Sequence, residues 1–124
     1  MRNTSANNTR RVSVSTAGVQ GNGGSPTTWS PHISGSGRYV AFESNATNLV
    51  ANDTNGTGDI FVRDRKQNKT RRVSVRFDGS QSNGPSAIAN VTSDGKFVTF
   101  FSNATNLVAG DTNGFTDIYL RSTR

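Results

Sequence analysis

Short segments in which apolar and polar residues alternate recur along this chain, and turn-forming residues separate them. Residues 38–43 (RYVAFE) and 96–101 (KFVTFF) place apolar side chains on both faces of an extended strand, which is typical of a strand lying between two sheets. Residues 59–63 (DIFVR) and 117–121 (DIYLR) are expected to form further strands. No window has the periodicity of an amphipathic helix, so the pattern predicts an all-β fold.

The strands belong to two near-copies of one unit. Residues 9–14 (TRRVSV) return 61 residues later at 70–75, and residues 44–50 (SNATNLV) return 58 residues later at 102–108. Self-similarity at such a period is typical of stacked units that cannot bury their apolar faces alone. The Leu-Val pair that ends the second motif predicts that this long polar loop packs against its sheet.

Each complete unit is predicted to have four strands, which lie near Ile33, Val40, Ile60 and Val73. Residues 1–8 precede the repeat and are expected to form a flexible arm. Residues 9–75 would then hold the outer strand of a neighbouring unit plus the first unit, and residues 76–124 three strands of the second. Turns before the second strands contain Gly37 and Asp94-Gly95, which predict tight hairpins.

The permuted order of strands predicts self-association. The spare strand at the start of the chain would have to reach back across a whole unit to complete the second unit of its own chain. Between chains the fit is direct, because the N-terminal strand of one copy can complete the second unit of the next. Such a contact is heterologous, and it ends in a ring only if the rotation closes.

The units resemble the TolB-like β-propeller repeat of bacterial proteins. The matching segments are 33–44 (ISGSGRYVAFES), 59–64 (DIFVRD) and 72–75 (RVSV) in the first copy, with 92–100 and 117–120 in the second. The resemblance implies two four-stranded antiparallel blades per chain, which complete a propeller by homo-oligomerisation. Six blades, hence a homotrimer, are favoured; a dimer would give four and a tetramer eight. It also implies a secreted, periplasmic or cell-surface bacterial protein.

The best ligand-like pattern is an Asp-Thr-Asn-Gly-x-x-Asp motif that occurs once in each copy. Carboxylates, an amide and a glycine turn in close succession are similar to the start of a calcium loop. The candidate ligands are Asp53, Asn55, Asp59, Asp111, Asn113 and Asp117. The EF-hand spacing is not met, and the pattern favours the alternative, a turn in which Asp accepts backbone N–H groups. Calcium is the one cofactor considered.

The chain is strongly basic, with 14 Lys and Arg against 8 Asp and Glu and a net charge of +6. Many of these cations follow the predicted third and outer strands: Arg10, Arg11, Arg63, Arg65, Lys66, Arg71 and Arg72. Such a surface suits an acidic polysaccharide or another glycan, but no recognised nucleic-acid motif accompanies it, so nucleic acid is not expected. The favoured interpretation is a solvated sheet edge protected against aggregation.

Residue types limit the function further. Cysteine is absent and there is one histidine, which excludes disulfides, thiolate metal sites and a cysteine nucleophile. No serine has a general base at a nucleophile elbow, so we expect a non-enzymatic structural or binding module. The alternatives are a lectin-like or hydrolase domain whose site forms only on assembly, and a propeller fragment without independent function. No apolar run approaches the roughly 18 residues of a membrane helix, so no membrane partner is expected. Trp29 is expected to pack at the inner strand.

Overall fold

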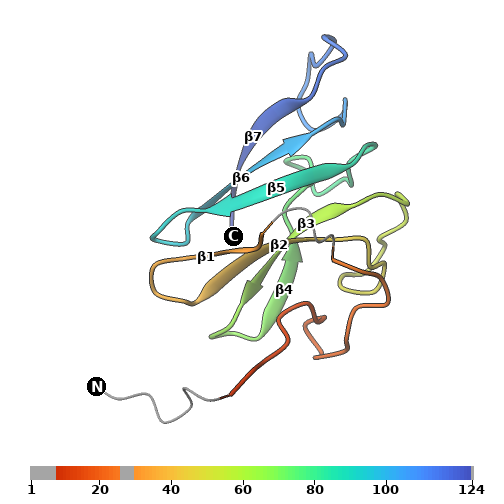
Figure 1. Ribbon diagram of the computed structural model, residues 1–124. Coiled ribbons are helices and arrows are strands. Elements are labelled where there is room, and N and C mark those ends of the chain that lie inside the picture. The colour runs from red at the N-terminus through yellow and green to blue at the C-terminus, as the bar shows by residue number, and fades with distance from the viewer. Residues whose placement is uncertain (1–7, 26–29, 124) are drawn as a thin grey trace.

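The computed structural model describes residues 8–25 and 30–123, and this part of the chain folds into two antiparallel sheets without a helix (Figure 1). The strands of the first sheet are, in order, β1 (His32–Ile33), β2 (Tyr39–Ser44), β3 (Asp59–Asp64) and β4 (Lys69–Arg72). Those of the second sheet are β5 (Ser86–Val91), β6 (Phe97–Ser102) and β7 (Asp117–Ser122). The all-β prediction is confirmed. Nothing in the described ranges is a helix long and apolar enough to cross a membrane.

Glycines at positive φ shape the two hairpin turns that the sequence predicts. Gly37, with a φ of 76°, lies between β1 and β2, and Gly95, with a φ of 75°, lies between β5 and β6. In each turn the glycine N–H donates to a carbonyl three residues earlier, that of Ser34 at 2.9 Å and that of Thr92 at 2.8 Å. Because side chains with a Cβ resist this conformation, glycine is the residue that these turns require.

The main apolar core lies between the two sheets. Ala41, Ile60 and Val62 from β2 and β3 belong to one buried cluster with Val91 and Val98 from β5 and β6. All six residues of β3 are buried, as expected of a strand that is covered on both faces. The burial of this apolar surface is the main force that holds one sheet against the other.

A smaller apolar cluster lies on the opposite face of the first sheet. Phe42 and Phe61 stack there with their ring centroids 5.8 Å apart, and the loop after β2 adds Ala46 and Leu49. In the second sheet the corresponding loop buries Leu107, which is 5% exposed. The prediction that the long polar loops pack against their sheets is therefore confirmed.

The segment before the first sheet departs from the sequence pattern. Residues 10–14 form no strand within this chain, where Val14 makes one isolated antiparallel bridge to Gln20. A strand needs a neighbour for its backbone hydrogen bonds. The repeat counterpart of this segment has that neighbour, because β4 pairs with β3. The pairing of residues 10–14 with another copy, which the sequence predicts, stays a prediction.

Other parts of the predicted organisation stay predictions. The flexible arm, apart from residue 8, and the packing of Trp29 lie outside the described residues. The division into 9–75 and 76–124 is compatible with the two sheets, since the first ends at Arg72 and the second begins at Ser86.

The close approach of Tyr39 to Gly95 gives a test of the packing between the sheets. A Cβ on Gly95 would lie 2.2 Å from Cδ2 of Tyr39, whereas a Cβ on Gly79, which has a similar φ of 86°, would meet nothing within 4 Å. Both Gly→Ala substitutions carry the positive-φ cost of about 1–2 kcal/mol. We expect Gly95→Ala to lose about 1–3 kcal/mol more than Gly79→Ala, because it also overpacks the contact.

Urea unfolding of both variants at one protein concentration measures this difference. Equal losses would show that the Tyr39 contact adds nothing to the stability of the two-sheet unit.

Candidate functional site

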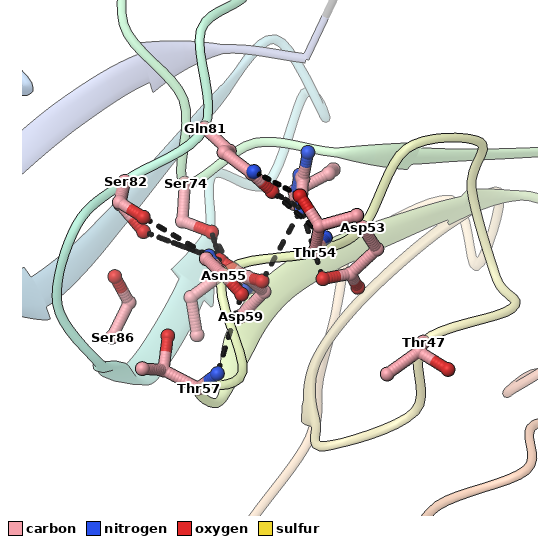
Figure 2. A network of polar contacts seen from close by, with 12 residues as sticks. Thr47, Asp53, Thr54, Asn55, Thr57, Asp59, Ser74, Gln81, Ser82 and Ser86 are labelled. Atoms are coloured by element: carbon pink, nitrogen blue, oxygen red, sulfur yellow. Dashed lines mark hydrogen bonds and ion pairs between the residues drawn. The ribbon is translucent and has the colours of Figure 1, made fainter.

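The first copy of the Asp-Thr-Asn-Gly motif lies in the loop that connects β2 to β3, as Figure 2 shows. Gly56 has a φ of 69° in this turn, and Asp59 begins β3 with its side chain fully buried. Nδ2 of Asn55 donates to Oδ1 of Asp59 at 3.2 Å, and Asp53 in the same loop is 7% exposed. The fold therefore brings together the three residues that the sequence groups as oxygen ligands.

Arg72, at the end of β4, supplies the positive charge of this cluster. Its Nη1 atom lies 3.1 Å from Oδ1 of Asp53 and 3.4 Å from Oδ2 of Asp59, and its side chain is 8% exposed. Oγ of Ser74 donates to Oδ1 of Asp59 at 2.7 Å, and Oε1 of Gln81 accepts from Arg72 at 3.2 Å. The guanidinium and these hydrogen bonds offset the cost of burying two carboxylates.

The charge balance at this cluster is visible in the pKa of Asp53. Burial raises the pKa of Asp53 above its usual value, the negative charge of Asp59 raises it further, and Arg72 opposes both effects. Removal of Arg72 would leave two carboxylates buried next to each other.

The interpretation of the outer-strand cations as a solvated edge is wrong for Arg63 and Arg72. Arg63 is 8% exposed, and its Nη1 donates to the carbonyl of Ser15 and to Oγ1 of Thr70, both at 3.1 Å. The side chain of Arg72 is buried beside the acidic loop. Its neighbour Arg71 is exposed and fits that interpretation, but Arg72 points to the other side of the strand and meets the acidic loop. No local pattern reveals this contact, because the loop and the strand come together only through the pairing of β3 with β4. The available signal was that both Arg72 and Gln81 have repeat counterparts, Arg11 and Gln20.

The second copy of the motif has the same carboxylates in a different setting. Nδ2 of Asn113 lies 3.2 Å from both carboxylate oxygens of Asp117, and the hydroxyl of Tyr119 donates to Oδ2 of Asp111 at 2.6 Å. Burial, together with that hydrogen bond, raises the pKa of the Tyr119 hydroxyl. Both aspartates are partly exposed, and within the described residues neither has an ion-pair partner.

These residues line an open cavity of about 500 Å³ beside β7, called here the acidic groove. Its walls include Val108, Asp111, Asn113, Asp117, Tyr119 and Leu120. The two copies of the motif thus differ in their surroundings: the first is closed over an internal arginine, and the second is open.

Calcium binding at the two motifs stays a prediction. In the first copy Nη1 of Arg72 lies 3.1 Å from Oδ1 of Asp53 and 3.4 Å from Oδ2 of Asp59, and its positive charge repels a cation. Only the second copy presents its carboxylates without a neighbouring positive charge. Among the described residues no group of three or more His, Cys, Asp or Glu side chains has the geometry to hold a metal ion.

A second cavity, of about 620 Å³, lies where the β1–β2, β3–β4 and β5–β6 turns meet. It is lined by the cations Arg38, Arg65, Lys66 and Lys96, together with Asp94, Tyr39 and small residues. Of the cations that follow the predicted third and outer strands, Arg65 and Lys66 line this cavity, and binding of an acidic polysaccharide or another glycan stays a prediction. Arg65 also supports the turn, since its Nη1 donates to the carbonyl of Gly37 at 2.6 Å.

The sequence and the structure were compared with known proteins. No family model matches this sequence, and no curated protein matches it either. Among solved structures the chain is similar to TolB from Acinetobacter baumannii, with 23% sequence identity and a TM-score of 0.43. The match covers 81% of this chain and 18% of the TolB chain, so the chain spans a small part of that protein's length.

The buried acidic cluster predicts unequal roles for two adjacent arginines. Arg72→Met keeps the side-chain volume but leaves Asp53 and Asp59 buried without their cation, which should cost about 3 kcal/mol of unfolding free energy. Arg71→Met is the control, because Arg71 is exposed on the same strand and should change stability by less than about 0.5 kcal/mol. Chemical denaturation of both variants gives the comparison, and similar losses would contradict an internal role for Arg72.

The ion pair beside the basic cavity predicts a dependence of stability on pH. Arg38 holds Asp64 through two hydrogen bonds, 2.9 Å from Nε to Oδ1 and 2.8 Å from Nη2 to Oδ2. These bonds lower the pKa of Asp64 from 3.8 to about 2. A carboxyl with a lowered pKa stabilises the fold above its unfolded pKa, and this contribution disappears as the pH falls through the folded pKa.

The difference in melting temperature between the wild-type chain and Arg38→Met should therefore be largest above pH 3.8 and shrink as the pH falls to about 2. Circular dichroism melts across this range measure it. A difference that does not change with pH would mean that the pair contributes packing and no charge interaction.

Proposed function

We propose that this chain is a non-enzymatic β-propeller module in which each copy supplies two blades and copies pack head-to-tail into a closed ring. One observation carries the proposal: the exposed face of the second sheet is, residue by residue, the repeat counterpart of the face that is buried in the first sheet.

The contrast is sharpest on the third strand of each sheet. Ile118 and Leu120 on β7 are 69% and 66% exposed, whereas their counterparts Ile60 and Val62 on β3 are 0% and 3% exposed. Burial of one such side chain contributes about 1.5–3 kcal/mol, so this face favours a partner. In Figure 1, β7 lies at the far end of the molecule from the first sheet.

The neighbouring strand continues the same apolar face. Phe97 and Phe101 on β6 are 42% and 38% exposed, and they pair with residues of β7 on this side of the sheet. Phe97 is the counterpart of Tyr39, which packs over the Gly95 turn of the next sheet in the chain. In the proposed ring Phe97 takes the same position over the Gly37 turn of another copy.

The first sheet of a second copy is the surface that fits this face. Within one chain, Val91 and Val98 of the second sheet cover the first sheet from that side, and both are buried. Their counterparts are Ile33 and Val40, and Ile33 is 53% exposed in the single chain. If two copies pack as the two sheets of one chain do, the exposed face of the second sheet of one copy and Ile33 of the other would both be covered.

The number of copies and the location follow from the resemblance of the repeats. Because TolB-like propellers favour six blades, we propose a ring of three chains that works as a structural or binding module outside the cytoplasm. Propellers present ligand-binding loops on such a rigid frame.

Light scattering coupled to size exclusion tests this proposal. We expect the wild-type chain to elute with about three times its mass of 13.2 kDa, and Leu120→Asp to elute as a folded monomer because a charge then lies in the interface. Val19→Asp is the control, since Val19 is 55% exposed and its counterpart Ser80 is also exposed in the chain. A monomeric wild-type chain, or a Leu120→Asp variant of unchanged mass, would contradict head-to-tail packing.

A further inference from the structure

The first sheet shows what a fourth strand provides for the third. β4 pairs with the outer edge of β3 and places Arg72 opposite Phe61. In the described part of the chain β7, the counterpart of β3, pairs with β6 alone. An edge of this kind presents backbone N–H and C=O groups to another strand. If the register of β4 is transferred to β7, the residue opposite Tyr119 is the counterpart of Arg72, which is Arg11.

Within the described ranges the carboxylates beside β7 have no cation, just as the outer edge of β7 has no paired strand. Asp53 and Asp59 lie buried around Arg72, at 3.1 Å and 3.4 Å. Asp111 and Asp117 repeat these carboxylates in the acidic groove without a guanidinium between them. The groove therefore lacks one cation, and the first copy of the motif shows which chemical group belongs there.

Arg11 already has the local contact that Arg72 uses. Nη1 of Arg11 donates to Oε1 of Gln20, and Nη1 of Arg72 donates to Oε1 of Gln81. The two pairs are repeat counterparts. Arg11 is exposed in the single chain, so its charge is available to a partner.

The hydrogen bonds of Asn22 indicate where residues 9–13 would lie relative to the first sheet. Asn22 exchanges side-chain and backbone hydrogen bonds with Thr47 in the loop after β2, just as Asn83 does with Thr105 in the loop after β6. Before Asn83 the chain comes from β4, on the preceding sheet. By analogy, residues 9–13 would come from a sheet that precedes the first sheet. In Figure 1 the first described residues lie outside both sheets of their own chain.

We propose that Arg11 of one copy enters the acidic groove of the next copy and pairs with Asp111 and Asp117, while residues 9–13 add a fourth strand to β7. This inference rests on the proposed head-to-tail assembly and names the residues that give it register. Ser13, the counterpart of Ser74, then donates to Asp117. Because the guanidinium fits only where the two carboxylates converge, a slipped strand leaves three charges unpaired.

The experiment compares two adjacent arginines in the full-length chain. Arg11→Met should raise the dissociation constant between copies on the order of a hundredfold, because it leaves the carboxylates buried without a cation. Arg10→Met is the matched control, since its counterpart Arg71 is exposed, and it should change the constant less than about threefold. Sedimentation over a range of protein concentrations measures both constants, and circular dichroism confirms that each variant folds.

A double-mutant cycle with Asp117→Asn tests the pairing itself. If Arg11 and Asp117 interact, their combined effect is much smaller than the sum of the two single effects. Additive effects, or equal effects of Arg10→Met and Arg11→Met, would overturn the pairing while head-to-tail assembly stands. A monomeric wild-type chain would overturn both. Assembly that requires added calcium would also overturn it, because the ion would then hold the carboxylates.

Discussion

Both faces of each sheet carry apolar side chains, and the rest of the structure depends on this constraint. Exposure of either apolar face to water is unfavourable, so cover from two sides stabilises a sheet of this kind. The first sheet satisfies the constraint with the second sheet on one face and its own loop on the other, and β3 is buried throughout. The second sheet satisfies it on one face, and β7 alternates between partly buried and exposed residues.

Polar contacts have stricter geometric requirements than this apolar packing. Apolar faces tolerate small shifts, but a guanidinium between two carboxylates has one position at which all charges are satisfied. The cluster of Asp53, Asp59 and Arg72 joins a loop, the start of β3 and the end of β4 in this way. Because the charges must be desolvated, the net stabilisation from this cluster is smaller than the cost of removing one of its partners.

The sequence predicted most of what is local and little of what is distant. Most strands and the hairpin turns followed from alternation and from Gly37 and Gly95, because those signals act over a few residues. The fourth strand was placed too late, near Val73, whereas β4 ends at Arg72. The grouping of Asp53, Asn55 and Asp59 was also local. Burial of Arg72 was missed, since it depends on the pairing of β3 with β4. Residues 10–14 carry a strand pattern without a strand, because a pattern does not supply a neighbour.

The two ends of this chain have different roles in the proposed ring, since one donates a strand and the other accepts one. In the proposed ring each copy would give a strand at one end and accept one at β7, so every contact between neighbours would be needed to keep the ring closed. A single chain with a defective end therefore opens the whole assembly, whatever the state of the other copies. In a mixed population the fraction of intact rings falls as a power of the fraction of intact chains, and the exponent is the number of copies in the ring.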